Sequence, residues 1–255
     1  MSHLMKNYGR LPVSFDHGQG VWLWDKEGHK YLDALAGIAV NSVGHAHPRL
    51  VRAIADQASK LIHCSNYFNI DLQEQVAEKL VEHSGLEGVF FCNSGLEANE
   101  CAIKIARKFG HAKGIEVPNI IVLKHAFHGR SIATLSATGN PSVRADFSPY
   151  TEGFIFVDES DLDGIRKIVE ENKNVVAIFF EPILGEGGVV PIDLSVIKGI
   201  REICDEHDLL MMCDEVQCGM GRSGKWFAHQ WAEIKPDVIT MAKGLAGGVP
   251  VGAVI

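Results

Sequence analysis

Residues 175–180 read Val-Val-Ala-Ile-Phe-Phe, and the acidic residue Glu181 follows them directly. A short apolar run without polar alternation is typical of a strand that is buried on both faces of a sheet. The same pattern of an apolar run followed by an acidic residue recurs at residues 209–213, Leu-Leu-Met-Met-Cys, which are followed by Asp214. Such strands occur in parallel sheets that are covered by helices, so the two runs indicate an α/β fold.

Further strand-like runs alternate with amphipathic helical stretches along the chain. The predicted strands are Gly88–Cys92, Asn119–Lys124, Gly153–Val157, Val175–Phe180, Leu209–Cys213, Val238–Ala242 and Gly252–Ile255. The predicted helices are Pro48–Ile62, Asp71–His83, Glu97–Phe109, Leu162–Asn172 and Val196–His207. Ser160 and Ser195 are the expected N-caps of the last two helices. This alternation predicts a mostly parallel, seven-stranded sheet with helices on both faces.

The first part of the chain has a different pattern. A small hairpin is expected between Gln19 and Asp33, and no helix-strand alternation precedes it. We interpret residues 1–45 as the N-terminal part of a small domain. Residues 46–255 are predicted to form a large domain.

Composition excludes several classes of protein. The net charge of −8 argues against a nucleic acid or an anionic membrane as partner, because phosphates attract Lys and Arg. No apolar run approaches the roughly 20 residues that span a bilayer, and residues 1–20 contain no apolar signal-peptide region. The six cysteines form no Cys-x-x-Cys pair, which is typical of reduced thiols in a cytoplasmic protein.

Polar residues follow five of the predicted strands, and the carboxyl ends of parallel strands meet at one edge of a sheet. Lys243 follows one strand and Asp214 another. A desolvated lysine offers a free amine, and a buried carboxylate needs a cationic partner such as a protonated pyridine nitrogen. Together they suggest a pyridoxal-phosphate site. A surface lysine at a strand end and an aspartate in a turn are the simpler alternatives.

A phosphate group would need donors, and Ser94-Gly95-Leu96 offers free amides at the start of a predicted helix. The same residues also fit a capping box between Ser94 and Glu97. Phe127 fits either stacking on a ligand ring or core packing. Arg130 fits either a carboxylate ligand or a solvated helix position.

Three other motifs are present in part, and their context argues against them. Gly219-x-Gly221-x-x-Gly224 lies five residues beyond its strand and lacks the acidic residue of a dinucleotide site. The same segment resembles a phosphate-binding P-loop, but Trp226 replaces the magnesium-binding hydroxyl residue. Residues 129–133 resemble a nucleophile elbow without its final glycine.

Taken together, the chain resembles the class-III, pyridoxal-phosphate-dependent aminotransferases, and within them the acetylornithine and ornithine branch. The matching motifs run in family order over most of the chain. They are Gly37–Asn41, Gly44–Pro48, Asn93–Glu100, Phe127–Arg130, Glu181–Gly188, Asp214–Gln217, Gly219–Gly224 and Ala242–Leu245. The resemblance implies a fold-type-I architecture, in which residues 46–255 form the large cofactor-binding domain.

The resemblance implies pyridoxal 5'-phosphate as the cofactor and assigns residues to its ring. Lys243 would form the Schiff base and move the substrate proton, and Asp214 would pair with the pyridine nitrogen. Val216 and Phe127 would pack on the two ring faces. Gln217 would contact the phenolic oxygen.

The remaining cofactor residues lie nearby in the family pattern. Ser94, Gly95 and the amide of Leu96 would hold the phosphate, although the family usually has Thr at the position of Leu96. His128 and Glu181 are assigned to the same cofactor site.

The substrate is assigned to two further residues. Arg130 would take the α-carboxylate, which favours the acetylornithine and ornithine branch, and Glu186 would gate substrate binding. His45 and His47 have the spacing of a metal pair but are interpreted as structural, so no metal is expected.

The implied reaction moves the amino group of N-acetylornithine to 2-oxoglutarate, by a ping-pong route in arginine biosynthesis. Ornithine, succinylornithine and 4-aminobutyrate are alternative donors, and a homodimer is expected. Only 12 residues follow Lys243, fewer than the family has, so the chain is expected to be a C-terminally truncated aminotransferase. A fragment that binds the cofactor without turnover is the alternative from another class.

Overall fold

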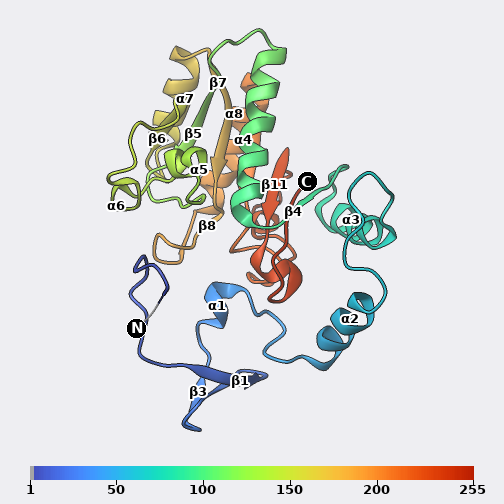
Figure 1. The fold of residues 1–255 in the computed structure, drawn as a ribbon. Helices are drawn as coiled ribbons and strands as arrows, with labels where there is room; N and C mark the ends of the chain where they lie inside the picture. Colours follow the sequence, from blue (N-terminus) through green and yellow to red (C-terminus); the bar gives the residue numbers. More distant parts are fainter. Residues whose placement is uncertain (1–2) are drawn as a thin grey trace. The chain divides into compact units, whose positions relative to one another are not determined.

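The computed structural model describes residues 3–255 and divides into two compact units, Met1–Ser65 and Asn66–Ile255 (Figure 1). The division places residues 46–65, which include helix α2 (Pro48–Ala58), with the first unit. The assignment of residues 1–45 and 46–255 to a small and a large domain stays a prediction.

The first unit is built on a three-stranded antiparallel sheet. Its strands are β1 (Phe15–Gln19), β2 (Trp22–Asp25) and β3 (Lys30–Leu32), and helix α1 (Ala36–Ala39) follows. The expected hairpin is present as β2 and β3, whereas β1 was not predicted. His45 bonds through Nε2 to Asp33 Oδ2 at 2.6 Å, which gives this histidine a structural partner.

The second unit contains a seven-stranded sheet in the order β4-β12-β11-β10-β7-β5-β6. Its strands are β4 (Phe90–Cys92), β5 (Asn119–Leu123), β6 (Phe154–Val157), β7 (Val175–Phe180), β10 (Leu210–Asp214), β11 (Val238–Met241) and β12 (Gly252–Val254). β6, β5, β7, β10 and β11 are parallel, and β12 runs antiparallel to both of its neighbours. The predicted α/β fold is confirmed, with each predicted strand in this sheet.

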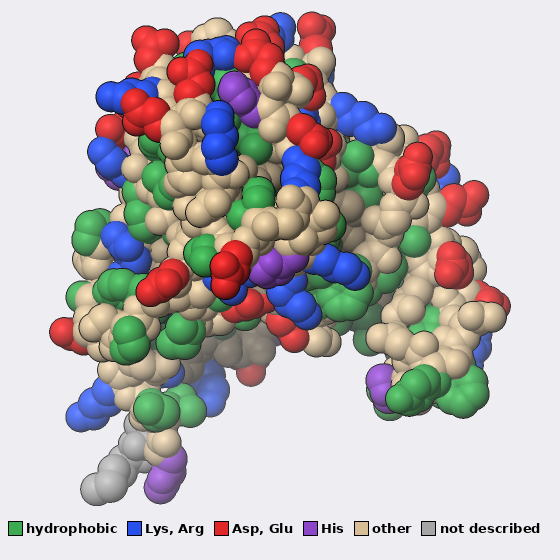
Figure 2. Space-filling model, turned by 90° about the horizontal axis from the view of Figure 1, so that it is seen from above, with side chains coloured by type: hydrophobic (Ala, Val, Ile, Leu, Met, Phe, Trp, Pro, Cys, Tyr) green, Lys and Arg blue, Asp and Glu red, His purple; other side chains and the backbone are tan. Residues whose placement is uncertain are grey.

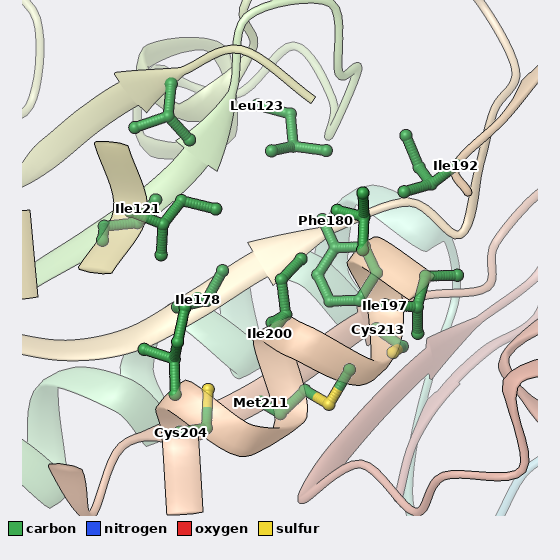
Figure 3. Packing of buried hydrophobic residues seen from close by; sticks show 14 of the residues in the cluster. Ile121, Leu123, Ile178, Phe180, Ile192, Ile197, Ile200, Cys204, Met211 and Cys213 are labelled. Atoms are coloured by element: carbon green, nitrogen blue, oxygen red, sulfur yellow. The ribbon is translucent and has the colours of Figure 1, made fainter. Parts of the chain in front are cut away.

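Helices cover both faces of this sheet, and the strand side chains alternate between two cores. Ile121 and Leu123 point into a core with helices α7 (Leu162–Glu171) and α8 (Leu194–His207). Figure 3 shows this cluster around Ile178, Phe180 and Met211. Ile120 and Val122 point into the other core, which contains helix α4 (Gly95–Ala112). The period of two therefore explains why these strands lack polar positions.

The remaining elements of the second unit are short apart from helix α3. They are α3 (Asp71–Ser84), α5 (Ile132–Ala137), α6 (Pro141–Arg144), β8 (Ile183–Leu184), β9 (Val190–Pro191) and the 3₁₀ helices η1 (Ala228–Ala232) and η2 (Lys243–Ala246). Only α3 among them was expected from the pattern, because the others are too short to show a period.

Two expected helix caps are wrong. Asp161, not Ser160, caps α7 by accepting from the amide of Gly164. Asp193, not Ser195, caps α8, and its carboxylate accepts from the amide of Ser195. In both cases an adjacent carboxylate meets the first free amides, where negative charge is also favoured by the helix dipole.

Charged side chains of both signs are interspersed on the face seen in Figure 2. None of the helices in the described part of the chain is both long and apolar enough to cross a membrane. Within residues 3–255, no group of three or more His, Cys, Asp or Glu side chains is arranged to hold a metal ion.

Candidate active site

The strand order reverses between β5 and β7. The chain passes from β5 to its neighbour β6 on one side, and then crosses to β7 on the other side (Figure 1). In open parallel sheets, ligands bind at such a point, outside the carboxyl ends of the strands. Phe127 and His128 follow β5, Glu181 follows β7, and Asp214 ends β10. The topology therefore brings these four predicted residues to one edge of the sheet.

Asp214 is the centre of a buried hydrogen-bond network, with only 2% of its surface exposed. Its Oδ2 accepts from Asn99 Nδ2 at 2.7 Å and from His128 Nδ1 at 2.8 Å. Its Oδ1 accepts from the amide of Val216 at 3.0 Å. Three donors thus fix the carboxylate while Oδ1 keeps room for one more donor.

His128 is held on three sides. Its ring stacks on Phe179 with 4.1 Å between centroids, and its amide donates to Thr138 Oγ1. Its Nε2 is buried and has no hydrogen-bond partner among the described residues. The bond from Nδ1 to Asp214 therefore sets the orientation of the imidazole.

Asn99 belongs to the same network, although the sequence analysis gave it no role. It lies on α4 and is 2% exposed, and its Nδ2 donates both to Asp214 and to the carbonyl of His128. The signal in the sequence is a polar residue beside Ala98 and one turn before Ala102, on the apolar face of a helix. A buried amide at such a position needs polar partners, which predicts a network without naming its members.

Glu181 ties together two loops at the same edge. Its Oε1 accepts from the amide of Phe127 at 2.8 Å, and its Oε2 accepts from the amide of Gly185 at 3.0 Å. Burial raises the pKa of Glu181 to about 7, and the charge of Asp214 acts in the same direction. Glu181 therefore changes its charge near neutral pH while it anchors both loops.

This pKa predicts how stability depends on pH. Because the pKa of Glu181 is higher in the folded chain than the usual value of 4.5, the folded chain binds this proton more tightly than the unfolded chain. The protonated side chain of Glu181 therefore adds to the free energy of unfolding below about pH 4.5, and this contribution is lost as the pH rises through 7. Its size is on the order of 3 kcal/mol at most. In urea unfolding, we expect the free energy of unfolding to fall less between pH 5 and pH 8 for Glu181→Gln than for the wild type.

The control for this experiment is Glu97→Gln. Hydrogen bonds from Asn93 lower the pKa of Glu97, so its contribution to stability has the opposite sign and is lost as the pH falls. An equal pH dependence of unfolding in wild type and Glu181→Gln would contradict the raised pKa of Glu181.

Lys243 follows β11 as the first residue of η2 and is half-buried. Burial lowers the pKa of Lys243, and the carboxylates of Asp214, Glu186 and Glu181 act against this. Its backbone is left-handed, with φ at +44°, which is uncommon for a residue with a side chain. Strained residues of this kind cluster at ligand sites, and a lowered pKa favours the neutral, nucleophilic amine.

Ser94 is the N-cap of α4, but the capping box expected between Ser94 and Glu97 is incomplete, because the Glu97 carboxylate accepts from the amide of Asn93 and not from that of Ser94. Ser94 Oγ accepts from the amide of Glu97 at 3.2 Å and donates to Glu97 Oε2 at 3.1 Å. This use of the hydroxyl leaves the amides of Gly95 and Leu96 as the donors of the helix start. An anion at this place would meet the positive end of the α4 dipole but also the nearby carboxylate of Glu97.

Two glycines bring the remaining predicted residues together. A Cβ atom on Gly95 would lie 2.6 Å from Val216 Cγ1, so the start of α4 packs directly on the loop after β10. A Cβ atom on Gly185 would overlap the carboxamide of Gln217. The side chain of Leu96 lies beside Gly129, because a Cβ atom on that glycine would be 3.5 Å from Leu96 Cγ.

The two predicted substrate residues line one cavity with Phe127. The cavity has a volume of about 600 Å³, and Phe127, Arg130 and Glu186 form part of its wall. The guanidinium carbon of Arg130 lies 5.8 Å from the centre of the Phe127 ring. The structure thus places a ring wall, a cation and a carboxylate around one space.

Glu215 is a buried carboxylate that the sequence analysis did not single out. It accepts from the amides of Ala228 and His229 at 2.8 Å and from His229 Nδ1 at 2.9 Å. Cys218 Sγ lies 3.2 Å from its Oε2. These contacts hold the loop after β10 in place, so Glu215 is an anchor for the neighbours of Asp214.

Comparison with known proteins decides the family. The family model described as aminotransferase class-III matches residues 4–255. The chain belongs to the class-III aminotransferases. Among curated members, it is 54% identical over 253 residues to the acetylornithine aminotransferase of Nitrosomonas europaea, covering 99% of this chain.

Solved structures of class-III aminotransferases have the same fold. The ornithine aminotransferase of Toxoplasma gondii matches with a TM-score of 0.93 and 34% identity, over 99% of this chain and 60% of that one. In that structure PLP occupies the active site in part. The N-acetylornithine aminotransferase of Stenotrophomonas maltophilia matches with a TM-score of 0.84 and 40% identity, over 97% and 62% of the two chains.

The chain spans less than two thirds of the length of these relatives. It covers 64% of the Nitrosomonas europaea protein.

Proposed function

We propose that this chain carries the cofactor site of a pyridoxal-phosphate-dependent aminotransferase. The observation that carries the proposal is the placement of Lys243 after β11 and Asp214 at the end of the adjacent β10, with a lowered pKa on the lysine. A reactive amine and a buried carboxylate on neighbouring strands are what a Schiff-base cofactor with a basic ring nitrogen requires.

The residues present fit this cofactor. Asp214 Oδ1 keeps room for a donor, which the protonated ring nitrogen would provide. The amides of Gly95 and Leu96 would take the phosphate at the start of α4. Lys243 would hold the aldehyde carbon through Nζ. Bound here, the cofactor supplies an electrophilic aldehyde and an electron-withdrawing ring.

The side chains of the two neighbouring loops would position the ring. Phe127 and Val216 would pack on its faces, and Gln217, pressed against Gly185, would bond to its phenolic oxygen. His128 and Glu181 would position the ring through other residues, since His128 bonds to Asp214 and Glu181 accepts from the amide of Phe127.

The chemical step follows from the charges at this site. Arg130 would bind the substrate α-carboxylate, which orients the amino group towards Lys243. Lys243 Nζ would then take the proton from the substrate α-carbon or, for an ω-amino donor, from the carbon that bears the reacting amine, and would deliver it to the cofactor carbon to which the amino nitrogen is attached. Burial of Lys243 keeps its amine available for this transfer because it disfavours the charged form. Glu186 lines the same cavity and would control which substrate enters.

For the donor we propose N-acetylornithine, with 2-oxoglutarate as acceptor in a ping-pong exchange of arginine biosynthesis. The support is the 54% identity to an acetylornithine aminotransferase, which exceeds the 34% identity to the Toxoplasma gondii ornithine enzyme. Ornithine, succinylornithine and 4-aminobutyrate are the alternative donors. A homodimer in the cytoplasm belongs to the same proposal, and the free state of the six cysteines is consistent with that location.

The test is the visible spectrum of the chain with pyridoxal phosphate, before and after N-acetylornithine. We expect a yellow band that bleaches when the donor is added. In a separate sample without donor, borohydride should trap the cofactor on Lys243. Trapping without bleaching would favour the fragment that binds the cofactor without turnover. No band and no trapping would contradict the proposed function of this chain.

A further inference from the structure

The amide group of Asn99 uses both of its protons in the network around Asp214. Asn99 Nδ2 donates to Asp214 Oδ2 at 2.7 Å and to the carbonyl of His128 at 2.7 Å. Its Oδ1 is buried and makes no hydrogen bond within residues 3–255. Exchanging the positions of Oδ1 and Nδ2 would place an acceptor against two acceptors, so the network fixes the orientation of this amide.

These two bonds join three elements of the second unit. Asn99 lies just after the first turn of α4, Asp214 is the last residue of β10, and His128 lies in the loop after β5. The neighbours Ala98 and Ala102 on α4 are buried in the core between this helix and the sheet. The helix is therefore a firm support, to which one side chain holds both a carboxylate and a loop.

Asn99 also decides which oxygen of Asp214 stays open. Each oxygen of a carboxylate accepts about two hydrogen bonds. Oδ2 accepts from Asn99 and from His128 Nδ1 at 2.8 Å, whereas Oδ1 accepts from the amide of Val216. A further donor must therefore approach Oδ1. Without the bond from Asn99, Oδ2 would also have an open position, and the carboxylate would lose one of the three donors that stop it from turning.

Thr240 is a buried polar neighbour of Asp214 without such bonds. It pairs with Asp214 in the register of β10 and β11 and is fully buried. Its Oγ1 makes no hydrogen bond to any residue that the structure describes. A polar group buried beside Asp214 is thus not by itself part of the network, and Asn99 is distinguished by its two bonds.

We propose that Asn99 is a positioning residue of the reaction, which holds Asp214 so that Oδ1 faces the nitrogen of the cofactor ring. The inference rests on the proposed function, because it takes Asp214 as the partner of that nitrogen. Asn99 acts through Asp214 and contacts neither cofactor nor substrate. A carboxylate that turns freely spends only part of its time in the orientation that pairs with the ring, so a fixed one binds the ring nitrogen more strongly.

The test compares the binding of pyridoxal phosphate with that of 1-deazapyridoxal phosphate, in which a carbon atom replaces the ring nitrogen. Both compounds have the aldehyde and the phosphate, so the ratio of their dissociation constants isolates the contact with Asp214. We expect the wild type to prefer pyridoxal phosphate by on the order of 10²-fold, and Asn99→Leu to reduce this preference by about tenfold. Borohydride should still trap pyridoxal phosphate on Lys243 in the variant.

Thr240→Val is the matched control, because it removes a buried hydroxyl beside Asp214 and should keep the wild-type ratio. Asn99→Ala is the second variant in case leucine disturbs the fold, since the smaller side chain leaves room for water at Asp214 and His128. It should reduce the ratio in the same direction. Urea unfolding without cofactor checks that each variant is folded. A role of Asn99 in stability alone would weaken both compounds equally and leave the ratio unchanged.

The outcomes separate this inference from the proposed function. An unchanged ratio in the folded Asn99 variants would overturn the inference and leave the proposed function in place. Equal binding of the two compounds by the wild type would also overturn it, because Asp214 would then make no contact that depends on the ring nitrogen. Absence of both binding and trapping at Lys243 in the wild type would overturn the proposed function and, with it, the role of Asn99.

Discussion

Replacing Lys243 by alanine is expected to abolish covalent trapping of pyridoxal phosphate and to slow the reaction with N-acetylornithine by about 10³-fold or more. In the proposed reaction the amine is both the attachment point of the cofactor and the group that moves the proton, so one substitution would remove two functions. The measurement is the rate of bleaching of the yellow band after mixing with the donor, together with mass spectrometry of the borohydride-treated chain.

This loss is expected without loss of the fold. Burial lowers the pKa of Lys243, which means that the folded chain disfavours the charged lysine that the unfolded chain carries at neutral pH. Alanine removes this penalty, so the variant should resist urea at least as well as the wild type. Lys167→Ala on the exposed side of α7 is the control, and it should trap and react normally. Normal bleaching by Lys243→Ala would contradict the assigned role.

The sheet was predictable because each of its strands is a short run of apolar residues that can be recognised from the local sequence. Val175–Phe180 and the other runs are apolar on both faces, and the structure confirms that alternate residues enter two cores. Strand β1 was missed because Phe15–Gln19 contains His17 and Gly18, which weaken the pattern of a strand. Helix α6 and the hairpin of β8 and β9 are too short to have a measurable period.

The candidate site was predictable where a residue lies at or just beyond the carboxyl end of a strand. Glu181 directly follows β7, Asp214 is the last residue of β10 and Lys243 comes two residues after β11, and the parallel order of these strands places all three at one edge. Asn99 and Glu215 were not assigned roles because their partners are distant in sequence. Asn99 meets Asp214 across 115 residues, and such a pairing is visible only in the fold.

Asp214 allows chemistry and folding to be separated with two substitutions. Asp214→Ala removes the acceptor of His128 Nδ1 and of the Val216 amide, and it takes one of the two acceptors of Asn99 Nδ2. Each buried donor left without a partner costs about 1–3 kcal/mol, so we expect a destabilisation of about 2–5 kcal/mol in urea unfolding without cofactor. Cofactor binding should be lost as well.

Asp214→Asn should keep more of the fold and still lose the reaction. Its carbonyl oxygen accepts the Val216 amide, and its amide group can donate to His128 Nδ1 if His128 carries its proton on Nε2, which has no partner among the described residues. The same amide group faces the Nδ2 donor of Asn99, so the hydrogen bond between residues 99 and 214 is lost. The neutral side chain cannot match the charge of a protonated ring nitrogen, so the bleaching rate should fall by about 10²–10³-fold. Asp163→Asn, an exposed residue in the first turn of α7, is the control for both measurements. If Asp214→Asn bleached at the wild-type rate, Asp214 would be an anchor for His128 and Asn99 rather than the partner of the cofactor ring.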